Sequence, residues 1–137
     1  MTFETSIDVR YPDCDSMGIV HHAVYPVWYE MARMAFFRSC GHDYTETHAL
    51  GIDPAMVHLE LDYGAPVRFP AAVTVRLTPT VCSGKKLGFR YELWTPGAEK
   101  PNASASSFHI WVKDGASYDL EMQNPEIFAA YAAAAEP

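Results

Sequence analysis

The sequence predicts an α+β fold in which a single antiparallel sheet wraps around one long central helix. Five segments alternate apolar and polar residues with a period of two, which is typical of half-buried strands. One long segment between the first and second of these is apolar around most of its circumference, which is typical of a buried helix. The last four strand segments follow one another through short connections, which favours antiparallel pairing in one sheet.

The chain length indicates one domain that spans residues 1–137. At roughly 150 residues per domain, 137 residues leave no room for a second unit. Hydrophobic residues make up 49% of the chain, so it contains enough apolar surface to build a core.

The first strand is predicted at 7–11, where Ile7, Val9 and Tyr11 alternate with polar side chains. The same alternation predicts four further strands, at 57–63, 73–78, 89–93 and 108–112. Such a sheet has free edges, and self-association commonly covers free edges. We therefore expect a homo-oligomer, at least a homodimer.

The central helix is predicted from Val24 to Cys40. This segment contains no glycine, and Pro26 is tolerated because it falls in the first helical turn. Gly41 then provides a natural stop. A second helix is predicted at the C-terminal end, over 124–137, because Asn124 and Pro125 form a favourable helix start.

The charge of the chain bears on its partners and its location. Its formal net charge is −7, which disfavours a nucleic-acid partner, although a local basic patch remains able to hold an anionic small molecule. No apolar run reaches the 18 or so residues needed to span a membrane, and no signal peptide is visible. We therefore expect a cytoplasmic protein, in which Cys14, Cys40 and Cys82 are reduced thiols.

The connection between the first strand and the central helix has the most unusual composition. It holds two carboxylates, a thiol and two imidazoles, so a metal site is the first hypothesis to test. A calcium loop would need a bidentate Glu where Val24 stands. Zinc spacings of the HExxH or CxxC kind are absent. We therefore expect no metal and no cofactor.

A second hypothesis for this connection is an acyl-transfer site. Asp13 and Asp15 can simply shape a turn. However, Gly18 would let a ligand approach the backbone closely, and the helix N-terminus near His22 would offer free N–H groups. A carboxylate beside such a terminus provides an attacking or activating group and a site for an oxyanion.

Two stretches of the chain can be compared with known families. The more specific one comprises Val9-Arg10-Tyr11, then Asp15-Ser16-Met17-Gly18-Ile19-Val20-His21-His22-Ala23-Val24-Tyr25, and then Glu30-Met31-Ala32-Arg33. The other, at 62–69, is Asp62-Tyr63-Gly64-Ala65-Pro66-Val67-Arg68-Phe69. Both resemble the 4-hydroxybenzoyl-CoA thioesterase family of hot-dog proteins, and the resemblance covers roughly residues 5 to 115. It implies a hot-dog fold, a coenzyme A thioester as substrate and a possible homotetramer.

The resemblance also implies roles for particular residues. Asp15 corresponds to the catalytic carboxylate of the family, and the backbone N–H at the position of His22 corresponds to the group that polarises the thioester carbonyl. Gly18 and Tyr25 fall at matching spacings and are expected to line the substrate site. Basic residues that meet coenzyme A phosphates in the family correspond to Lys85 and Lys86.

His58 is a further candidate for substrate contact. It shares a strand face with Glu60 and Asp62, which indicates either a solvated face or the border of an active site in an oligomer.

We therefore predict a thioesterase that hydrolyses an acyl-CoA to the free acid and coenzyme A. A thiol is a good leaving group, so hydrolysis needs only a carboxylate, water and an oxyanion site. Whether Asp15 attacks directly or activates water is left open. The alternatives are another hot-dog enzyme, such as a hydratase or dehydratase, and a non-catalytic acyl-CoA-binding module.

Overall fold

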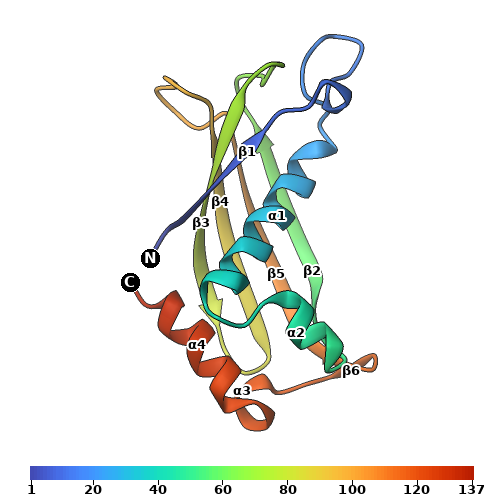
Figure 1. Cartoon of the computed structure of the whole chain (residues 1–137), viewed down its shortest axis with the longest axis vertical. Coiled ribbons are helices and arrows are strands. Elements are labelled where there is room, and N and C mark those ends of the chain that lie inside the picture. Colours follow the sequence, from blue (N-terminus) through green and yellow to red (C-terminus); the bar gives the residue numbers. More distant parts are fainter.

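The computed structural model describes residues 1–137 and consists of one antiparallel sheet with a long helix, α1, across one of its faces (Figure 1). The strands are β1 (Phe3–Asp8), β2 (Ile52–Tyr63), β3 (Ala72–Cys82), β4 (Lys86–Trp94), β5 (Ala103–Lys113) and β6 (Ala116–Ser117). The helices are α1 (Val24–Ser39), α2 (Tyr44–Ala49), α3 (Leu120–Gln123) and α4 (Pro125–Ala135), and a short 3-10 turn covers Tyr11–Asp13.

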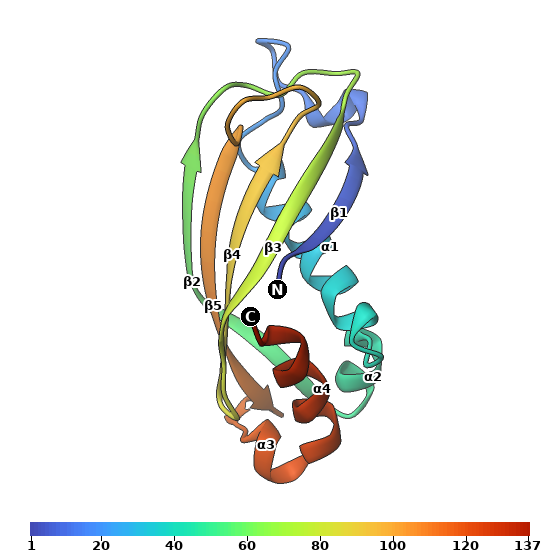
Figure 2. The same ribbon diagram turned by 90° about the vertical axis from the view of Figure 1, so that its left-hand side faces the viewer.

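The strand order in the sheet is β1-β3-β4-β5-β2, and β6 adds to the end of β5. Every pair is antiparallel, so β1 and β2 form the two edges of the sheet. Figure 2 shows the curvature of the sheet, with α1 on its inner face and α4 near one end. The antiparallel sheet around one long helix confirms the predicted fold class.

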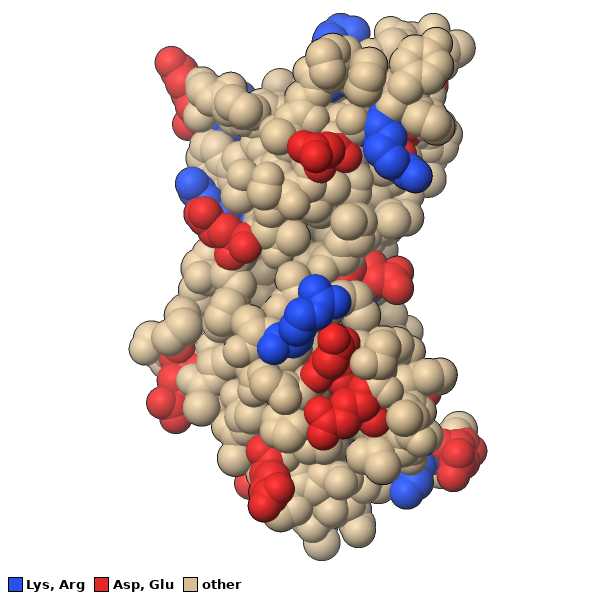
Figure 3. Space-filling model, viewed as in Figure 1, with Lys and Arg blue, Asp and Glu red and all other residues tan.

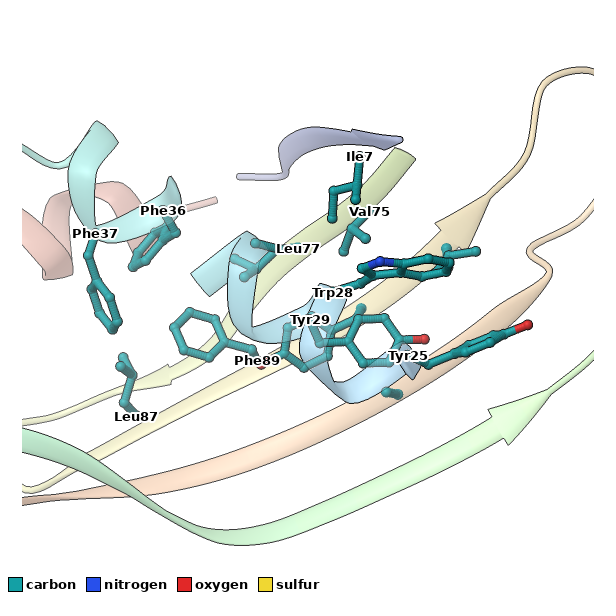
Figure 4. Packing of buried hydrophobic residues seen from close by; sticks show 14 of the residues in the cluster. Ile7, Tyr25, Trp28, Tyr29, Phe36, Phe37, Val75, Leu77, Leu87 and Phe89 are labelled. Atoms are coloured by element: carbon teal, nitrogen blue, oxygen red, sulfur yellow. The ribbon is translucent and has the colours of Figure 1, made fainter. Parts of the chain in front are cut away.

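The core lies between α1 and the inner face of the sheet (Figure 4). Phe36 of α1 meets Phe3 of β1 and Phe89 of β4 edge-on, with ring centroids 5.0 and 5.3 Å apart. The residues that α1 buries are Tyr25, Trp28, Tyr29, Ala32, Arg33, Phe36 and Phe37. Burying this row of large aromatic side chains is the main interaction that holds the helix on the sheet.

The five predicted strands and the central helix are all present. The first strand begins and ends earlier than predicted, because Pro12 has no N–H to donate and Tyr11 lies in the 3-10 turn. The C-terminal helix covers Pro125–Ala135, close to the predicted 124–137. The sequence did not predict α2, α3 or β6, which are all short.

The expectation that α1 is buried all round is wrong for a single chain. Val27 and Met31 remain 54% and 46% exposed, because the single sheet covers only one face of the helix. Arg33, in contrast, is buried although it is charged.

A row of buried polar groups runs from α1 across the inner face of the sheet. Arg33 donates from Nη1 to the hydroxyl of Tyr91 at 3.0 Å, and that hydroxyl lies 2.7 Å from Oγ of Ser107. Ser107 in turn lies 2.9 Å from Nε2 of His109. Burial, together with the nearby positive charge of Arg33, lowers the pKa of His109 to about 4. His109 is therefore neutral at pH 7.

The lowered pKa of His109 makes the stability of the fold depend on pH. An unfolded histidine titrates near about 6.5, so between there and about pH 4 the unfolded chain binds more protons than the folded one. The stability that the fold gains from keeping His109 neutral is fully present above about pH 6.5 and is lost as the pH falls toward about 4. We expect urea unfolding to show a smaller loss of stability on acidification in His109→Gln than in the wild type. Parallel losses in the two proteins would contradict this.

Candidate active site

The loop that carries Asp15 is a tight hairpin between β1 and α1. Cys14 and Val20 form an antiparallel bridge across it, and the N–H of Asp15 donates to the carbonyl of Ile19 at 2.8 Å. The turn closes with the N–H of Gly18 on the carbonyl of Asp15 at 3.1 Å. Gly18 has a φ of +76°, which a residue with a side chain rarely adopts. The glycine predicted to allow close approach is therefore also needed for the turn.

This hairpin is fixed to the connection between β2 and β3. The N–H of Val20 donates to the carbonyl of Val67 at 2.8 Å, and Ile19 forms an antiparallel bridge with Arg68. Val20 and Val67 are both buried, with 3% and 1% of their surface exposed. The position of the Asp15 loop is thus set by backbone contacts to a segment far away in the sequence.

The two aspartates of the loop have different surroundings. Asp13 is 3% exposed, and its carboxylate accepts hydrogen bonds at 2.8 Å from both the backbone N–H and the guanidinium of Arg10. Burial acts to raise the pKa of Asp13, but the hydrogen bonds and charge of Arg10 outweigh it, so this pKa lies below its usual value. These bonds indicate that Asp13 holds the backbone of the turn.

Asp15 is more open. Its Oδ1 accepts the N–H of Met17 at 2.8 Å, and its carboxylate forms no ion pair. The side chain is partly exposed. Most of its lone pairs are therefore free to accept a proton from water or to attack a carbon atom.

The N-terminus of α1 follows directly after the hairpin. His21 caps this end, because its Nδ1 accepts the N–H of Ala23 at 3.0 Å and its carbonyl accepts that of Val24 at 2.9 Å. The N–H groups of His22 and Tyr25 have no acceptor within the protein. Free N–H groups at the positive end of a helix favour an anion or a polarised carbonyl oxygen.

Two tyrosines fix the start of α1 to the end of β2. The rings of Tyr25 and Tyr63 meet edge-on with centroids 5.0 Å apart, and the hydroxyl of Tyr63 donates to the carbonyl of His22 at 2.8 Å. Tyr25 is buried, which raises the pKa of its hydroxyl, so it remains protonated at neutral pH. The contact of Tyr63 with the start of α1 was not predicted from the sequence, although Tyr63 is the last residue of a predicted strand and lies in the motif at 62–69.

The remaining predicted site residues lie elsewhere in the chain. Lys85 and Lys86 lie near the end of β3, where the chain turns into β4. The Asp15 loop lies at the other end of the sheet, near the start of β3. A strand of 11 residues is about 35 Å long. The two lysines therefore lie at the opposite end of the sheet from Asp15 within one chain. The physical reason is that antiparallel strands bring alternate connections to opposite ends of the sheet.

His58 is also separate from Asp15. It is exposed, lies opposite Phe108 of β5 on the outer face of the sheet, and pairs with Glu60 at 3.3 Å. One chain thus brings Asp15, Gly18, His22 and Tyr25 together and leaves His58, Lys85 and Lys86 apart from them.

A groove of about 350 Å³ separates β1 from the exposed face of α1. Its lining includes Asp13 but not Asp15; the other lining residues are Ile7, Asp8, Arg10, Val24, Val27, Trp28 and Met31.

None of the helices has the length and apolar character required to cross a membrane.

Comparison with known proteins decides the family. A model described as "Thioesterase superfamily" matches residues 17–101, more than half of the chain. The chain belongs to the thioesterase superfamily. The match begins two residues after Asp15 and includes Gly18, His22 and Tyr25.

Individual relatives agree with this assignment. The chain is 32% identical over 106 residues to the Bacillus subtilis protein named "Putative acyl-CoA thioesterase YneP", which covers 77% of this chain and 76% of the relative. Among solved structures, a hypothetical protein of Thermus thermophilus is 33% identical with a TM-score of 0.89, covering 97% of each chain. A DHNA-CoA thioesterase from Staphylococcus aureus has a TM-score of 0.91 at 24% identity, covering 97% of this chain and 90% of its own. The predicted family, hot-dog fold and enzyme class are confirmed.

Proposed function

We propose that this thioesterase hydrolyses an acyl-CoA, with Asp15 as its catalytic carboxylate. The observation that carries the proposal is that one short segment, residues 15–25, holds both a carboxylate without an ion-pair partner and the unpaired N–H groups of His22 and Tyr25. The names of relatives as acyl-CoA thioesterases support coenzyme A as the carrier.

In one form of the mechanism, Asp15 acts as a general base. Its carboxylate takes a proton from water while the water oxygen bonds to the thioester carbon. The carbonyl oxygen becomes an oxyanion, which the N–H group of His22 stabilises at the positive end of α1. Collapse of this intermediate breaks the carbon–sulfur bond, and the departing thiolate of coenzyme A recovers a proton.

In the other form, Asp15 attacks the thioester carbon itself. The thiolate leaves, and the acyl group is held as a mixed anhydride on the carboxylate. Water then hydrolyses this anhydride to give the free acid and restore Asp15. Both forms use the same carboxylate and the same N–H groups, and neither needs a cofactor.

We expect Asp15→Asn to lower kcat for the best acyl-CoA substrate by a factor on the order of a hundred or more. The amide neither accepts a proton from water nor attacks as a nucleophile. The measurement is steady-state hydrolysis, with circular dichroism to verify that the variant is folded.

Asp13→Asn is the matched control, because it makes the same chemical change two residues away. It weakens the bonds to Arg10, so we expect lower thermal stability and a smaller loss of kcat than in Asp15→Asn. Near wild-type turnover in Asp15→Asn would contradict the proposed role of Asp15.

We also propose that the protein is a homodimer or a homotetramer. The outer edge of β2 has no partner strand, and Met56, Val57 and Tyr63 of this strand are 41%, 56% and 49% exposed. A strand edge that is unpaired and carries exposed apolar side chains is suited to cover by a second copy.

Light scattering of the purified protein at micromolar concentration tests this assembly. We expect a mass of two or four times the 15.3 kDa chain. Replacement of Val57 by Asp should shift the mass toward that of one chain, because it places a charge on the exposed edge. A stable 15.3 kDa wild-type species would contradict the proposal.

In such an assembly, the remaining predicted residues of one subunit can reach the substrate of another. Because His58, Lys85 and Lys86 are separate from Asp15 in one chain, we propose that they contact only an acyl-CoA bound to a neighbouring subunit.

A further inference from the structure

Arg33 of α1 is a buried cation that the chain leaves without a counter-charge. Only 8% of the residue is exposed, and no carboxylate forms an ion pair with it. Its one side-chain hydrogen bond goes from Nη1 to the neutral hydroxyl of Tyr91. A buried charge is costly unless it is paired, and arginines are rarely buried without a partner. The position of Arg33 is therefore suited to an anion that the single chain does not supply.

A second buried donor in the same region also lacks a partner. Tyr29 is fully buried, and its hydroxyl has no hydrogen-bond partner in the protein. Burial raises the pKa of this hydroxyl, so it stays protonated and is able to donate. The ring of Tyr29 packs on the ring of Tyr91 with centroids 4.7 Å apart, and Tyr91 is also the residue that Arg33 contacts. The groups around Tyr91 thus include more donors than acceptors, and a carboxylate, which only accepts, complements them.

The guanidinium of Arg33 is still open to solvent in part. The buried side-chain polar atoms that have no partner are the hydroxyl of Tyr29 and Nε1 of Trp94. Nε and Nη2 of Arg33 have no acceptor in the protein and are not among these sealed atoms. A ligand that lies beside α1 therefore has access to them.

The inner face of β2 provides a surface along which such a ligand can lie. The helix α1 packs on β3 and β1 rather than on β2, so this face is only partly covered. Leu59 pairs with Ser107, whose side chain is buried on the inner face, so Leu59 and Leu61 also point inward. Both leucines are half-buried. We call these two leucines, together with Tyr25 and Tyr29 of α1, the inner lane.

Two lengths place the ends of the inner lane. At one end, the hydroxyl of Tyr63 donates to the carbonyl of His22 at 2.8 Å. At the other end, Leu59 is four residues back along β2, which is about 13 Å. Arg33 is eleven residues after His22 on α1, about 16 Å, and its side chain leans back toward the helix N-terminus. An acyl group of medium length whose carbonyl meets the N–H of His22 can therefore place its far end at Arg33.

The charge of the whole protein makes this cation important for an anionic chain end. The net charge is −7, and Figure 3 shows acidic side chains spread over the visible face with only scattered basic ones. Such a surface repels an anion overall, so an anionic acyl group must be held by a specific cation. A guanidinium presents a fork of N–H donors that matches the two oxygens of a carboxylate. A methyl end would instead leave Arg33 unpaired.

We propose that the acyl group of the substrate lies in the inner lane and ends in a carboxylate that binds Arg33. The substrate class is thus the CoA thioester of a dicarboxylic acid, with the thioester at Asp15 and the free carboxylate about three helical turns along α1. The nearest further donor to this carboxylate is the hydroxyl of Tyr29. This inference rests on the proposed function, because it assumes a thioester at Asp15.

A matched pair of substrates tests the inference. The two CoA thioesters have the same chain length and differ only at the far end, which is a carboxylate in one and a methyl group in the other. We expect kcat/KM of the wild type to be about tenfold higher or more for the carboxylated thioester, the effect of one charge-assisted hydrogen bond. In Arg33→Met this preference should disappear, because the variant has no cation at the end of the lane.

Arg33→Met is expected to fold, because replacement of a buried charge by an apolar side chain of similar size is often neutral or stabilising. Circular dichroism verifies this. The matched control is Arg90→Met, which removes an exposed positive charge next to Tyr91 on the outer face of β4 and should keep the wild-type preference. Isothermal titration with the free dicarboxylate needs no turnover and should show weaker binding to Arg33→Met than to the wild type or to Arg90→Met.

The possible outcomes separate this inference from the proposed function. If the wild type hydrolyses acyl-CoAs without preferring the carboxylated one, the inference is wrong and the proposed function stands. An unchanged preference in Arg33→Met also overturns it. If that variant in addition changes the mass in light scattering, the counter-charge of Arg33 comes from a second copy of the chain. Weaker binding of the dicarboxylate to Arg33→Met than to a wild type that hydrolyses no CoA thioester would contradict the proposed function alone.

Discussion

The hydrogen bond from Val20 to the carbonyl of Val67 fixes the part of the molecule on which the proposed chemistry depends. It joins the hairpin after β1 to the connection before β3, and both residues are buried. Together with the bridge between Ile19 and Arg68, it attaches the Asp15 loop to a segment far away in the sequence. These contacts fix the backbone that carries Asp15 relative to the start of α1. Preorganisation of this kind is what a hydrolytic site needs, because water and the thioester must meet the carboxylate in one geometry.

The same unit explains why two neighbouring aspartates receive different roles. The carboxylate of Asp13 is occupied by Arg10 and stabilises the turn, whereas Asp15 keeps most of its hydrogen-bonding capacity. The start of α1 shows a similar division, because His21 satisfies the N–H groups of Ala23 and Val24 and leaves those of His22 and Tyr25 unpaired. The groups that keep free hydrogen-bonding capacity are thus the ones that the proposed mechanism uses.

Local patterns in the sequence were enough to predict the main helix and the strands. The contacts between segments far apart in the sequence could not be predicted from such patterns. The helix at Val24–Ser39 follows from a glycine-free apolar run before Gly41, and each strand follows from its alternation. Asp15 could be selected from its position before a helix start and from the family resemblance. The bridge between Ile19 and Arg68 could not, since it joins segments that no periodicity relates. That Lys85 and Lys86 lie at the opposite end of the sheet from the Asp15 loop could not be predicted either, because charge and turn composition carry no information on strand direction.

The most direct test of the account is the release of free thiol by the purified wild-type protein over a panel of aryl, short-chain and long-chain CoA thioesters. The account predicts that at least one member gives equal amounts of coenzyme A thiol and free acid. A hydratase or dehydratase would change the acyl group and leave the thioester intact, and a binding module would change nothing. Binding or consumption of the thioesters without thiol release from any of them would contradict the account.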